Sequence, residues 1–219
     1  MIPPEQSSEF VAHMEKVLDV YKRPYTKEYP VVCMDESPKQ LIGETRITDR
    51  IKHGCKLKDY EYRRKGVCNI FMANEPLAGK RIVKITERRT KQDWAKFIKD
   101  IADSYPNAKK ITLVMDNLNT HKPSSLYETF SPRKAKLLWD RFEFVYTPKH
   151  GSWLNMAEIE LNVLNGQCLN RRIDNKETII EEVEAWQEHR NNKNASIDWH
   201  FTTKDAIVKL KRLYPSILI

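Results

Sequence analysis

The chain has 219 residues, of which 40% are hydrophobic and 31% are charged, and its formal net charge at pH 7 is +8. This apolar fraction is enough for a folded core and excludes a wholly disordered chain. No stretch approaches the roughly 18 apolar residues of a spanning helix, and the N-terminus lacks the features of a signal peptide, so we expect no membrane insertion and a cytoplasmic location.

The excess of basic residues favours an anionic partner. Nucleic acid fits best, because Lys and Arg recur along the whole chain and do not gather in one tail. The four cysteines form no CxxC pair and have no metal-ligand spacing, so we expect free thiols and no structural zinc site.

The N-terminal part of the chain begins with a linker-like segment, residues 1–29. Apolar residues at three- and four-residue steps predict a short amphipathic helix in it, which Pro24 ends. Residues 30–36 predict a buried strand with Asp35 at its C-terminal edge, and residues 37–60 predict a basic loop.

The next elements are predicted as a hairpin followed by a helix. Residues 66–73 and 81–86 have strand patterns, and the Pro-Leu-Ala-Gly turn at 76–79 connects them. Residues 91–104 place their apolar side chains on one helical face, so we expect a helix there.

The C-terminal half continues with a second buried strand, residues 110–117, which ends in Asp116. A helix at 123–141 and a strand at 142–147 follow. Helices are then predicted with the ranges 152–169, with Ser152 as N-cap, 176–192 and 203–213. This order indicates a mixed α/β sheet covered by helices, in a domain that spans residues 30–219.

Two strand ends in this pattern carry carboxylates. Asp35 and Asp116 each follow an apolar run, where a carboxylate is costly unless it is solvated, paired or bound to a metal. A single such Asp is most often a turn residue, but two matching cases with an acid-bearing helix favour a site.

That helix carries the third acid. Asn155, Glu158 and Asn162 share one face, so Glu158 can point toward the sheet edge. Glu160 lies about 200° around the helix from Glu158, and we expect it to be solvated or to face DNA. Three carboxylates brought together would repel one another, and a pair of Mg²⁺ ions would remove that repulsion and suit phosphoryl transfer.

Three blocks of the sequence resemble the signature blocks of DDE transposases, most closely the bacterial insertion-sequence group related to mariner elements. The blocks are Val32–Glu36, Leu113–His121 and Thr147–Glu158. The segments 60–64, 74–79 and 199–206 are also similar to that group, so the resemblance covers nearly the whole chain.

The resemblance implies a ribonuclease-H-like fold and a metal-dependent DNA transposase. It implies that Asp35, Asp116 and Glu158 hold two Mg²⁺ ions, with Mn²⁺ as a possible substitute. The implied reaction nicks double-stranded DNA at element ends and joins the 3′-hydroxyl ends to target DNA. A homodimer on DNA and a nucleoid-associated location are implied as well.

Two departures from the family pattern are present. Asp116 and Glu158 are 42 positions apart, more than in typical mariner-type enzymes, and the extra residues fall in the helix predicted at 123–141. Members of the group also carry N-terminal helix-turn-helix domains. Residues 1–29 are too short for one and resemble only the linker, so a separately encoded end-recognition domain is a candidate partner.

Other residues are candidates for supporting roles. Asn117 could orient a metal-bound water or cap a turn, and His121 fits a loop residue slightly better than a site residue. Trp153 fits packing of its helix better than stacking on a base. The candidate DNA-contacting residues are basic: Lys149, His150, Arg63, Arg64, Arg88, Arg89, Lys91, Arg171 and Arg172.

Two alternatives to an active transposase stay open at the level of the sequence. The first is an inactive or accessory DNA-binding remnant that lacks the end-recognition domain. The second is a structure-directed nuclease on the same fold, which cuts DNA without strand transfer. No P-loop, nucleophile elbow or Gly-rich nucleotide motif competes with these readings.

Overall fold

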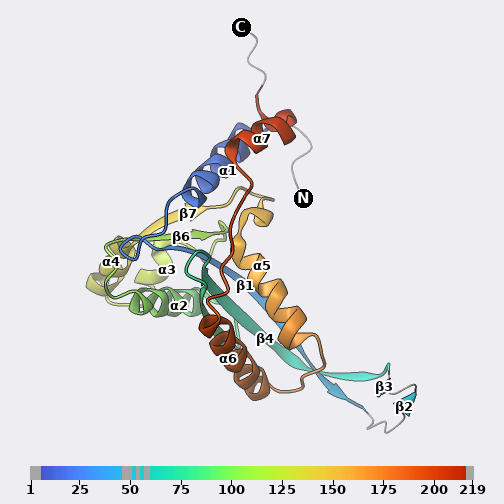
Figure 1. Ribbon diagram of the computed structural model, residues 1–219. Helices are drawn as coiled ribbons and strands as arrows, with labels where there is room; N and C mark the ends of the chain where they lie inside the picture. The colour runs from blue at the N-terminus through green and yellow to red at the C-terminus, as the bar shows by residue number, and fades with distance from the viewer. Residues whose placement is uncertain (1–5, 46–50, 53–54, 57–59, 216–219) are drawn as a thin grey trace.

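A computed structural model describes residues 6–45, 51–52, 55–56 and 60–215. Its centre is a five-stranded mixed sheet with the strand order β5-β4-β1-β6-β7 (Figure 1). The strands are β1 (Val31–Glu44), β4 (Tyr62–Glu75), β5 (Lys80–Thr86), β6 (Ile111–Met115) and β7 (Phe142–Tyr146). Two short strands, β2 (Ile51–Lys52) and β3 (Cys55–Lys56), pair separately. The predicted α/β fold class is confirmed.

The sheet is antiparallel on one side and parallel on the other. β1 pairs with β4 antiparallel, and β4 pairs with β5 in the predicted hairpin. β1 also pairs with β6 in parallel, but only from Val31 to Cys33, and β6 pairs in parallel with β7. The change of neighbour along β1 positions the candidate site described below.

The prediction for the first strand is wrong in its length. Residues 37–44 continue β1 and do not form a loop, because β4 pairs with β1 up to Glu44. Asp35 therefore lies inside β1 and not at its C-terminal edge. β4 likewise begins at Tyr62, four residues before the start that its apolar pattern predicts.

Three helices cover one face of the sheet, namely α2 (Lys91–Ser104), α3 (Pro123–Tyr127) and α4 (Pro132–Arg141). Their apolar side chains form one core with Val32, Met34 and Phe71 of the sheet. The prediction of a single helix at 123–141 is wrong. The chain forms two helices, and each begins with a proline at its first turn, where the missing N–H costs nothing.

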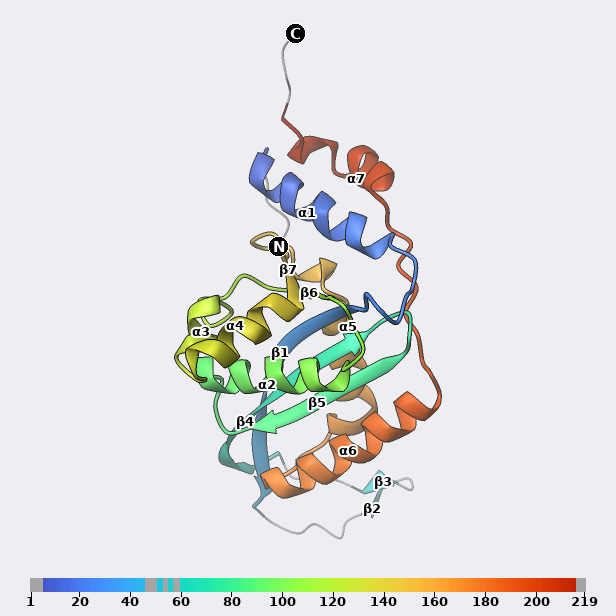
Figure 2. The same cartoon turned by 90° about the vertical axis from the view of Figure 1, so that its left-hand side faces the viewer.

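The opposite face is covered by α1 (Ser8–Tyr21), α5 (Met156–Leu164) and α6 (Lys176–Asn192), which form a second core with Cys33 and Met72. Figure 2 shows α7 (Thr203–Lys209) beside α1. The N-terminal helix is amphipathic as predicted. Its buried residues belong to this core, so α1 packs onto the body of the domain.

The backbone before and after α5 is less regular than the single helix predicted for residues 152–169. Ser152–Leu154 is a 3₁₀ turn, and Asn155, not Ser152, caps α5 with its side chain. Asn155 is thereby the residue that fixes where the helix begins. Beyond Leu164, Asn165–Leu169 forms a π-helical turn, a feature that is frequent at functional sites.

Three cysteines lie in the described ranges, and all three are free thiols, as expected (Cys33, Cys68 and Cys168). Across the same described residues, none of the helices has the length and apolarity that a membrane crossing requires.

Candidate active site

The alternation of β1 separates two neighbouring acids onto opposite faces of the sheet. Cys33 belongs to the core under α1, α5 and α6, and Met34 belongs to the core under α2 to α4. Because successive side chains of a strand alternate, Asp35 lies on the α5 side and Glu36 on the α2 side. Both acids follow the last pairing of β1 with β6, so they lie level with the end of β6.

Asp35 is half-buried, and its Oδ1 accepts a hydrogen bond of 2.8 Å from the backbone N–H of Glu36. Burial raises the pKa of Asp35 to about 7, and the negative charges of Asp116, Glu36 and Glu158 add to this rise. The three predicted acids therefore lie close enough together to influence one another electrostatically. This proximity joins residues from β1, the end of β6 and α5.

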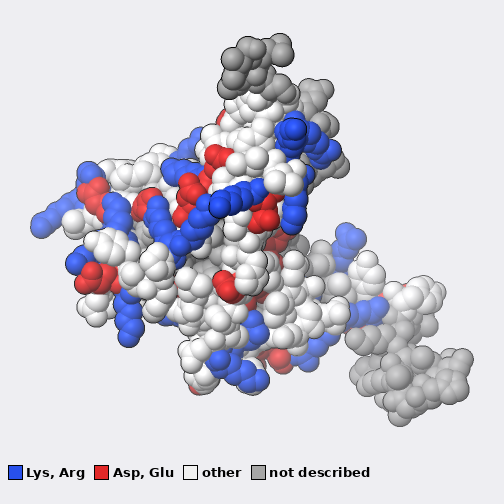
Figure 3. Space-filling model, turned by 45° about the horizontal axis from the view of Figure 1, so that its top comes forward, with Lys and Arg blue, Asp and Glu red and all other residues white. Residues whose placement is uncertain are grey.

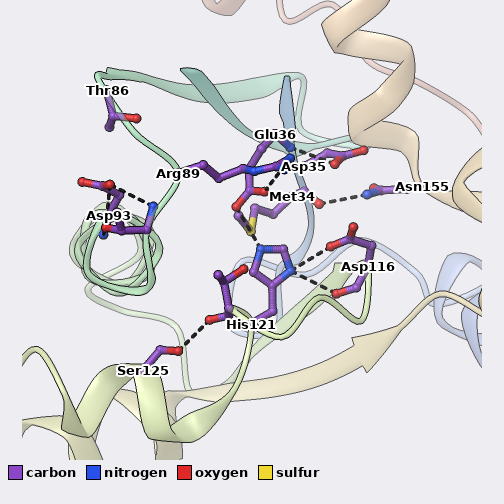
Figure 4. Close-up of polar contacts among 12 residues, drawn as sticks. Met34, Asp35, Glu36, Thr86, Arg89, Asp93, Asp116, His121, Ser125 and Asn155 are labelled. Atoms are coloured by element: carbon purple, nitrogen blue, oxygen red, sulfur yellow. Dashed lines mark hydrogen bonds and ion pairs between the residues drawn. The ribbon is translucent and has the colours of Figure 1, made fainter. Parts of the chain in front are cut away.

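Asp116 directly follows β6 and is held by His121. The Nδ1 atom of His121 lies 2.7 Å from Oδ1 of Asp116 and 3.1 Å from its backbone oxygen (Figure 4). The side chain of Asp116 is 34% exposed, whereas His121 is fully buried. Asp116 can therefore contact a ligand while its own orientation is fixed from within the protein.

His121 also contacts the second acid of the first sequence block. Its Nε2 lies 2.9 Å from Oε1 of buried Glu36, and its ring stacks on Trp94 with a centroid separation of 5.6 Å. Arg89 lies 3.9 Å from Oε2 of Glu36. Burial lowers the pKa of His121, but hydrogen bonds to Asp116 and Glu36 outweigh it and raise the pKa to about 9. His121 does lie in the loop between β6 and α3, but it is buried there and contacts two acids, which supports the alternative interpretation of a site residue.

Glu158 is positioned by the cap of its own helix. The side chain of Asn155 donates a 2.8 Å hydrogen bond to the backbone oxygen of Met34 and accepts one from the N–H of Ala157. One buried side chain therefore ties the start of α5 to β1 next to Asp35. Glu158 follows three residues later and is half-buried.

Glu160 has the opposite environment from the one expected. It is fully buried and makes a bidentate ion pair with Arg81 of β5, with distances of 2.7 and 2.8 Å. Arg190 of α6 donates a third hydrogen bond of 3.0 Å to it. The prediction of a solvated or DNA-facing Glu160 is wrong, because two arginines distant in sequence supply the partners that make its burial possible.

A hollow of about 600 Å³ opens beside Asp116. Asp116, Asn117, Leu118, Thr147, Pro148, Lys149, His150 and Ser152 line it from the loops, and Ser7, Glu9, Phe10 and His13 line it from the N-terminal segment. The predicted DNA contacts Lys149 and His150 are exposed and lie in this hollow. We name it the α1 hollow, because α1 forms one of its walls.

The other predicted DNA contacts lie elsewhere. Arg63 and Arg64 are exposed on the first residues of β4. Arg171 pairs with Glu182, and Arg172 pairs with Glu44 at the end of β1. All four lie toward the end of the β1–β4 ribbon away from β6, and basic side chains are visible over much of the surface (Figure 3).

The four remaining candidates have different environments. Lys91 pairs with Glu128 at the start of α2. Trp153 packs edge-on against Phe201 at 5.7 Å between ring centroids, as the packing interpretation predicts. The exposed Asn117 lines the α1 hollow, and Arg88 lies before α2 on the surface.

The donor chemistry of the site fits a hard divalent cation. Three carboxylates lie near one another, and burial raises the pKa of Asp35, with the negative charges of Asp116, Glu36 and Glu158 adding to the rise. Oxygen ligands of this type are those that Mg²⁺ and Mn²⁺ prefer. In the arrangement of the described residues, however, no three His, Cys, Asp or Glu side chains already form a group that could hold a metal ion. Side-chain movement would have to complete such a site.

The residue that sequence reasoning missed is Glu36. Its signal was present, because β1 alternates and Glu36 follows Met34 on a fully buried face, where an unpaired carboxylate is costly. A second missed role is that of Asn155 as the tie between α5 and β1.

The comparisons with known proteins agree with this geometry. A family model described as DDE superfamily endonuclease matches residues 30–180. No curated protein matches the chain.

Several solved structures share the fold. The Mos1 mariner paired end complex with Mn superposes with a TM-score of 0.62 at 13% identity, over 99% of this chain and 66% of that one. The Mos1 strand transfer complex gives 0.56 at 11% identity, over 92% and 65%. The catalytic domain of Mos1 mariner transposase gives 0.56 at 10% identity, over 89% and 96%. The chain thus spans slightly less than two thirds of the longer Mos1 chains and nearly all of that catalytic domain, and its fold is ribonuclease-H-like.

Proposed function

Since the chain belongs to the DDE superfamily of endonucleases, we propose that it is the catalytic domain of a DNA transposase. In this proposal it nicks double-stranded DNA at element ends and joins the resulting 3′-hydroxyl ends to target DNA. The observation that carries the proposal is the placement of three acids at one edge of the sheet. Asp35 follows the β1–β6 pairing, Asp116 follows β6, and α5, which carries Glu158, is tied to Met34 of β1. The charges of Asp116 and Glu158 add to the rise in the pKa of Asp35 that its burial causes.

Asp35, Asp116 and Glu158 would hold divalent cations in this proposal. Bound Mg²⁺ or Mn²⁺ supplies charge that stabilises the attacking and leaving oxygens of phosphoryl transfer. Two solved Mos1 complexes are described with Mn and with Mg, which supports this choice of ions. Two ions per site are part of the proposal, because one ion cannot serve both oxygens equally.

The chain's own residues contribute position and charge. His121 holds Asp116 in one orientation, and Asn155 holds the start of α5 against β1. Lys149 and His150 contact phosphates of the DNA from the wall of the α1 hollow. Arg63, Arg64, Arg171 and Arg172 add salt-sensitive backbone contacts along the β1–β4 ribbon, the last two by exchanging their present carboxylate partners.

The two proposed steps conserve atoms as follows. In the first, water attacks a phosphodiester phosphorus, the bond to the 3′-oxygen breaks, and a 3′-hydroxyl and a 5′-phosphate result. In the second, that 3′-hydroxyl attacks a phosphorus of the target and loses its proton. A 3′-oxygen of the target leaves and becomes a hydroxyl, so the number of phosphodiester bonds does not change.

The biological setting is also part of the proposal. We place the protein in the bacterial insertion-sequence group, in the cytoplasm and associated with the nucleoid, as a homodimer on DNA. A separately encoded helix-turn-helix domain would recognise the element ends. Solved Mos1 complexes include a paired end complex with the left transposon end, which supports double-stranded DNA as the partner.

The test uses two labelled DNA substrates with Mg²⁺, with Mn²⁺ and with chelator. A duplex that carries candidate element ends reports nicking, and a precut duplex with a free 3′-hydroxyl reports transfer of its label into a plasmid. We expect both products with metal and neither with Asp116→Ala, while Asp19→Ala, a change at an exposed carboxylate, behaves as wild type. Nicking without label transfer would indicate a nuclease. If a folded wild type gives no product, the end-recognition domain is added in trans, and a lack of product even then would indicate the inactive remnant.

A further inference from the structure

A second hollow lies on the other side of the acids from the α1 hollow. It has a volume of about 250 Å³, and its lining residues are Ser37, Pro38, Lys39, Ile70, Leu161, Asn162, Asn165 and Leu169. We name it the β1–α5 hollow. Its lining contains no carboxylate and thus none of the three predicted acids.

Strand alternation connects this hollow to the candidate active site. Asp35, Ser37 and Lys39 lie on the same face of β1, because side chains two residues apart point the same way. Ser37 and Lys39 both line the hollow and are half-buried. The floor of the hollow is therefore the direct continuation of the strand that carries Asp35.

Helix periodicity makes the same connection from α5. Asn162 and Asn165 follow Glu158 by four and seven residues, so the three side chains share a face. Both asparagines are exposed and line the hollow. Figure 1 shows α5 running alongside β1, and the hollow is a groove with residues of both elements in its lining.

The end of the groove is built from the π-helical turn Asn165–Leu169. The Nζ atom of Lys39 donates a 2.5 Å hydrogen bond to the backbone oxygen of Leu169, which ties β1 to this turn. A Cβ atom added at Gly166 would meet no heavy atom within 4 Å, so the turn leaves open space. The ammonium group and the amides provide hydrogen-bond donors and one positive charge.

We propose that the β1–α5 hollow binds the sugar–phosphate backbone of the DNA strand that leaves the acids on the side opposite the α1 hollow. This inference rests on the proposed function, whose substrate it extends. Amide and hydroxyl donors with one Lys suit phosphate and sugar oxygens and carry no base specificity. Arg63 and Arg64 lie beyond the hollow, opposite the end of β1. A DNA strand that runs along β1 from the acids would therefore next meet two basic residues.

The test replaces neutral donors with negative charge of the same shape. The double variant Asn162→Asp/Asn165→Asp places two carboxylates where we expect phosphate. Asn170→Asp is the matched control, because Asn170 is exposed just beyond the π turn and does not line the hollow. Binding of a labelled 40-base-pair duplex is measured by fluorescence anisotropy in chelator, and thermal melting checks that each variant folds.

We expect the double variant to bind about tenfold more weakly than wild type and Asn170→Asp to stay within about twofold, since like charges repel at short range. Should the double variant fail to fold, Asn162→Ala/Asn165→Ala is measured, with a weakening of about threefold expected from the lost donors. Equal affinity of a folded double variant and the control would overturn the inference, as would a wild type that does not bind DNA.

The same proteins in the nicking assay separate the two proposals. If the wild type binds DNA through these asparagines but gives no metal-dependent product even with the end-recognition domain added in trans, the proposed function fails and the β1–α5 hollow remains a DNA site. If the wild type cuts and transfers DNA while the double variant binds as tightly as the control, the function stands and the inference is wrong.

Discussion

The Nε2 atom of His121 lies 2.9 Å from Oε1 of Glu36, and both side chains are fully or almost fully buried. This contact joins the first and second blocks of the sequence, 85 residues apart. Because the other ring nitrogen of His121 contacts Asp116, Glu36 acts on Asp116 through one imidazole. The arrangement is that of a carboxylate that orients a histidine, which in turn orients a candidate metal ligand.

Two conservative variants can separate the two contacts of His121. In His121→Asn the side-chain amide nitrogen takes the place of Nδ1, and in His121→Gln it takes the place of Nε2. We expect His121→Asn to keep more nicking activity, because it retains the contact with Asp116. We expect His121→Gln to keep more stability, because it retains the partner of Glu36.

The measurements are initial nicking rates and urea unfolding, with DNA affinity as a reference. Loss of an orienting partner reduces activity by about 10- to 100-fold, so we expect His121→Gln in that range with unchanged DNA affinity. If both variants lose activity and stability in parallel, the imidazole has only a structural role.

Metal binding is expected to stabilise the folded chain. At a concentration of Mn²⁺ one hundred times its Kd, the free energy of unfolding should rise by about 2.7 kcal/mol, because the unfolded chain lacks the site. For a domain of this size the melting temperature would rise by about 5–10 °C. Chelator should reverse the shift, and Asp35→Asn should abolish it.

Asp19→Asn is the control for this experiment, since Asp19 is an exposed carboxylate paired only with Lys22. An equal shift in wild type and Asp35→Asn would show that the ion binds elsewhere.

Several elements could be predicted with accurate ends because their signals are local. The helix at 91–104 matches α2, whose N-cap Thr90 forms a capping box with Asp93, and the helix at 176–192 matches α6, which Asn175 caps. Caps and apolar faces lie within a few residues of each other, so one stretch of sequence contains them all.

The missed features depend on partners that are distant in sequence. The continuation of β1 past Asp35 comes from pairing with β4, and residues 37–44 carry no clear alternation of their own. The burial of Glu160 depends on Arg81, 79 residues away. Asp35 lies inside β1 and not at its end, but β6 ends beside it, so Asp35 is nevertheless part of the candidate site.

The acids of the site could be named from the sequence, but their support could not. Asp35 and Asp116 each follow an apolar run, and Glu158 shares a helix face with Asn155 and Asn162. These patterns can be recognised in the sequence alone. The contacts of His121 with Glu36 and of Asn155 with Met34 connect segments that only the folded sheet brings together.

Glu158 and Glu160 provide a test of which acid of α5 acts at the site. Glu158→Gln should abolish metal-dependent nicking and leave the stability nearly unchanged, because Glu158 is half-buried. Glu160→Gln should lower the free energy of unfolding by about 3–5 kcal/mol, because it leaves Arg81 buried without its charge partner.

Nicking rates and urea unfolding of the two variants decide the assignment. Nicking should persist in Glu160→Gln at temperatures where it remains folded. Full activity in Glu158→Gln with selective loss in folded Glu160→Gln would reverse the roles of the two acids.

The acid stability of the domain should depend on Glu143 of β7. Its carboxylate accepts hydrogen bonds from Arg23 at 2.7 and 3.1 Å and from Thr112 at 2.8 Å. The hydrogen bonds from Arg23 lower the pKa of Glu143 to about 2, with a smaller contribution from Thr112. A carboxyl with a lowered pKa binds protons less readily in the folded state than in the unfolded state. Its contribution to stability is therefore complete above the ordinary pKa of 4.5 and is lost as the pH falls toward 2.

We expect Glu143→Gln to remove this contribution, which we place at about 1 kcal/mol because the pair is largely exposed to solvent and salt. Urea unfolding of wild type and variant between pH 7 and pH 3 measures it. The stability difference between the two proteins should be constant above about pH 5 and shrink below it. Asp140→Asn, a change at an exposed carboxylate of α4, provides the matched control. A Glu143→Gln difference that is independent of pH would show that shape and hydrogen bonding, not charge, join the segment after α1 to the sheet at this point.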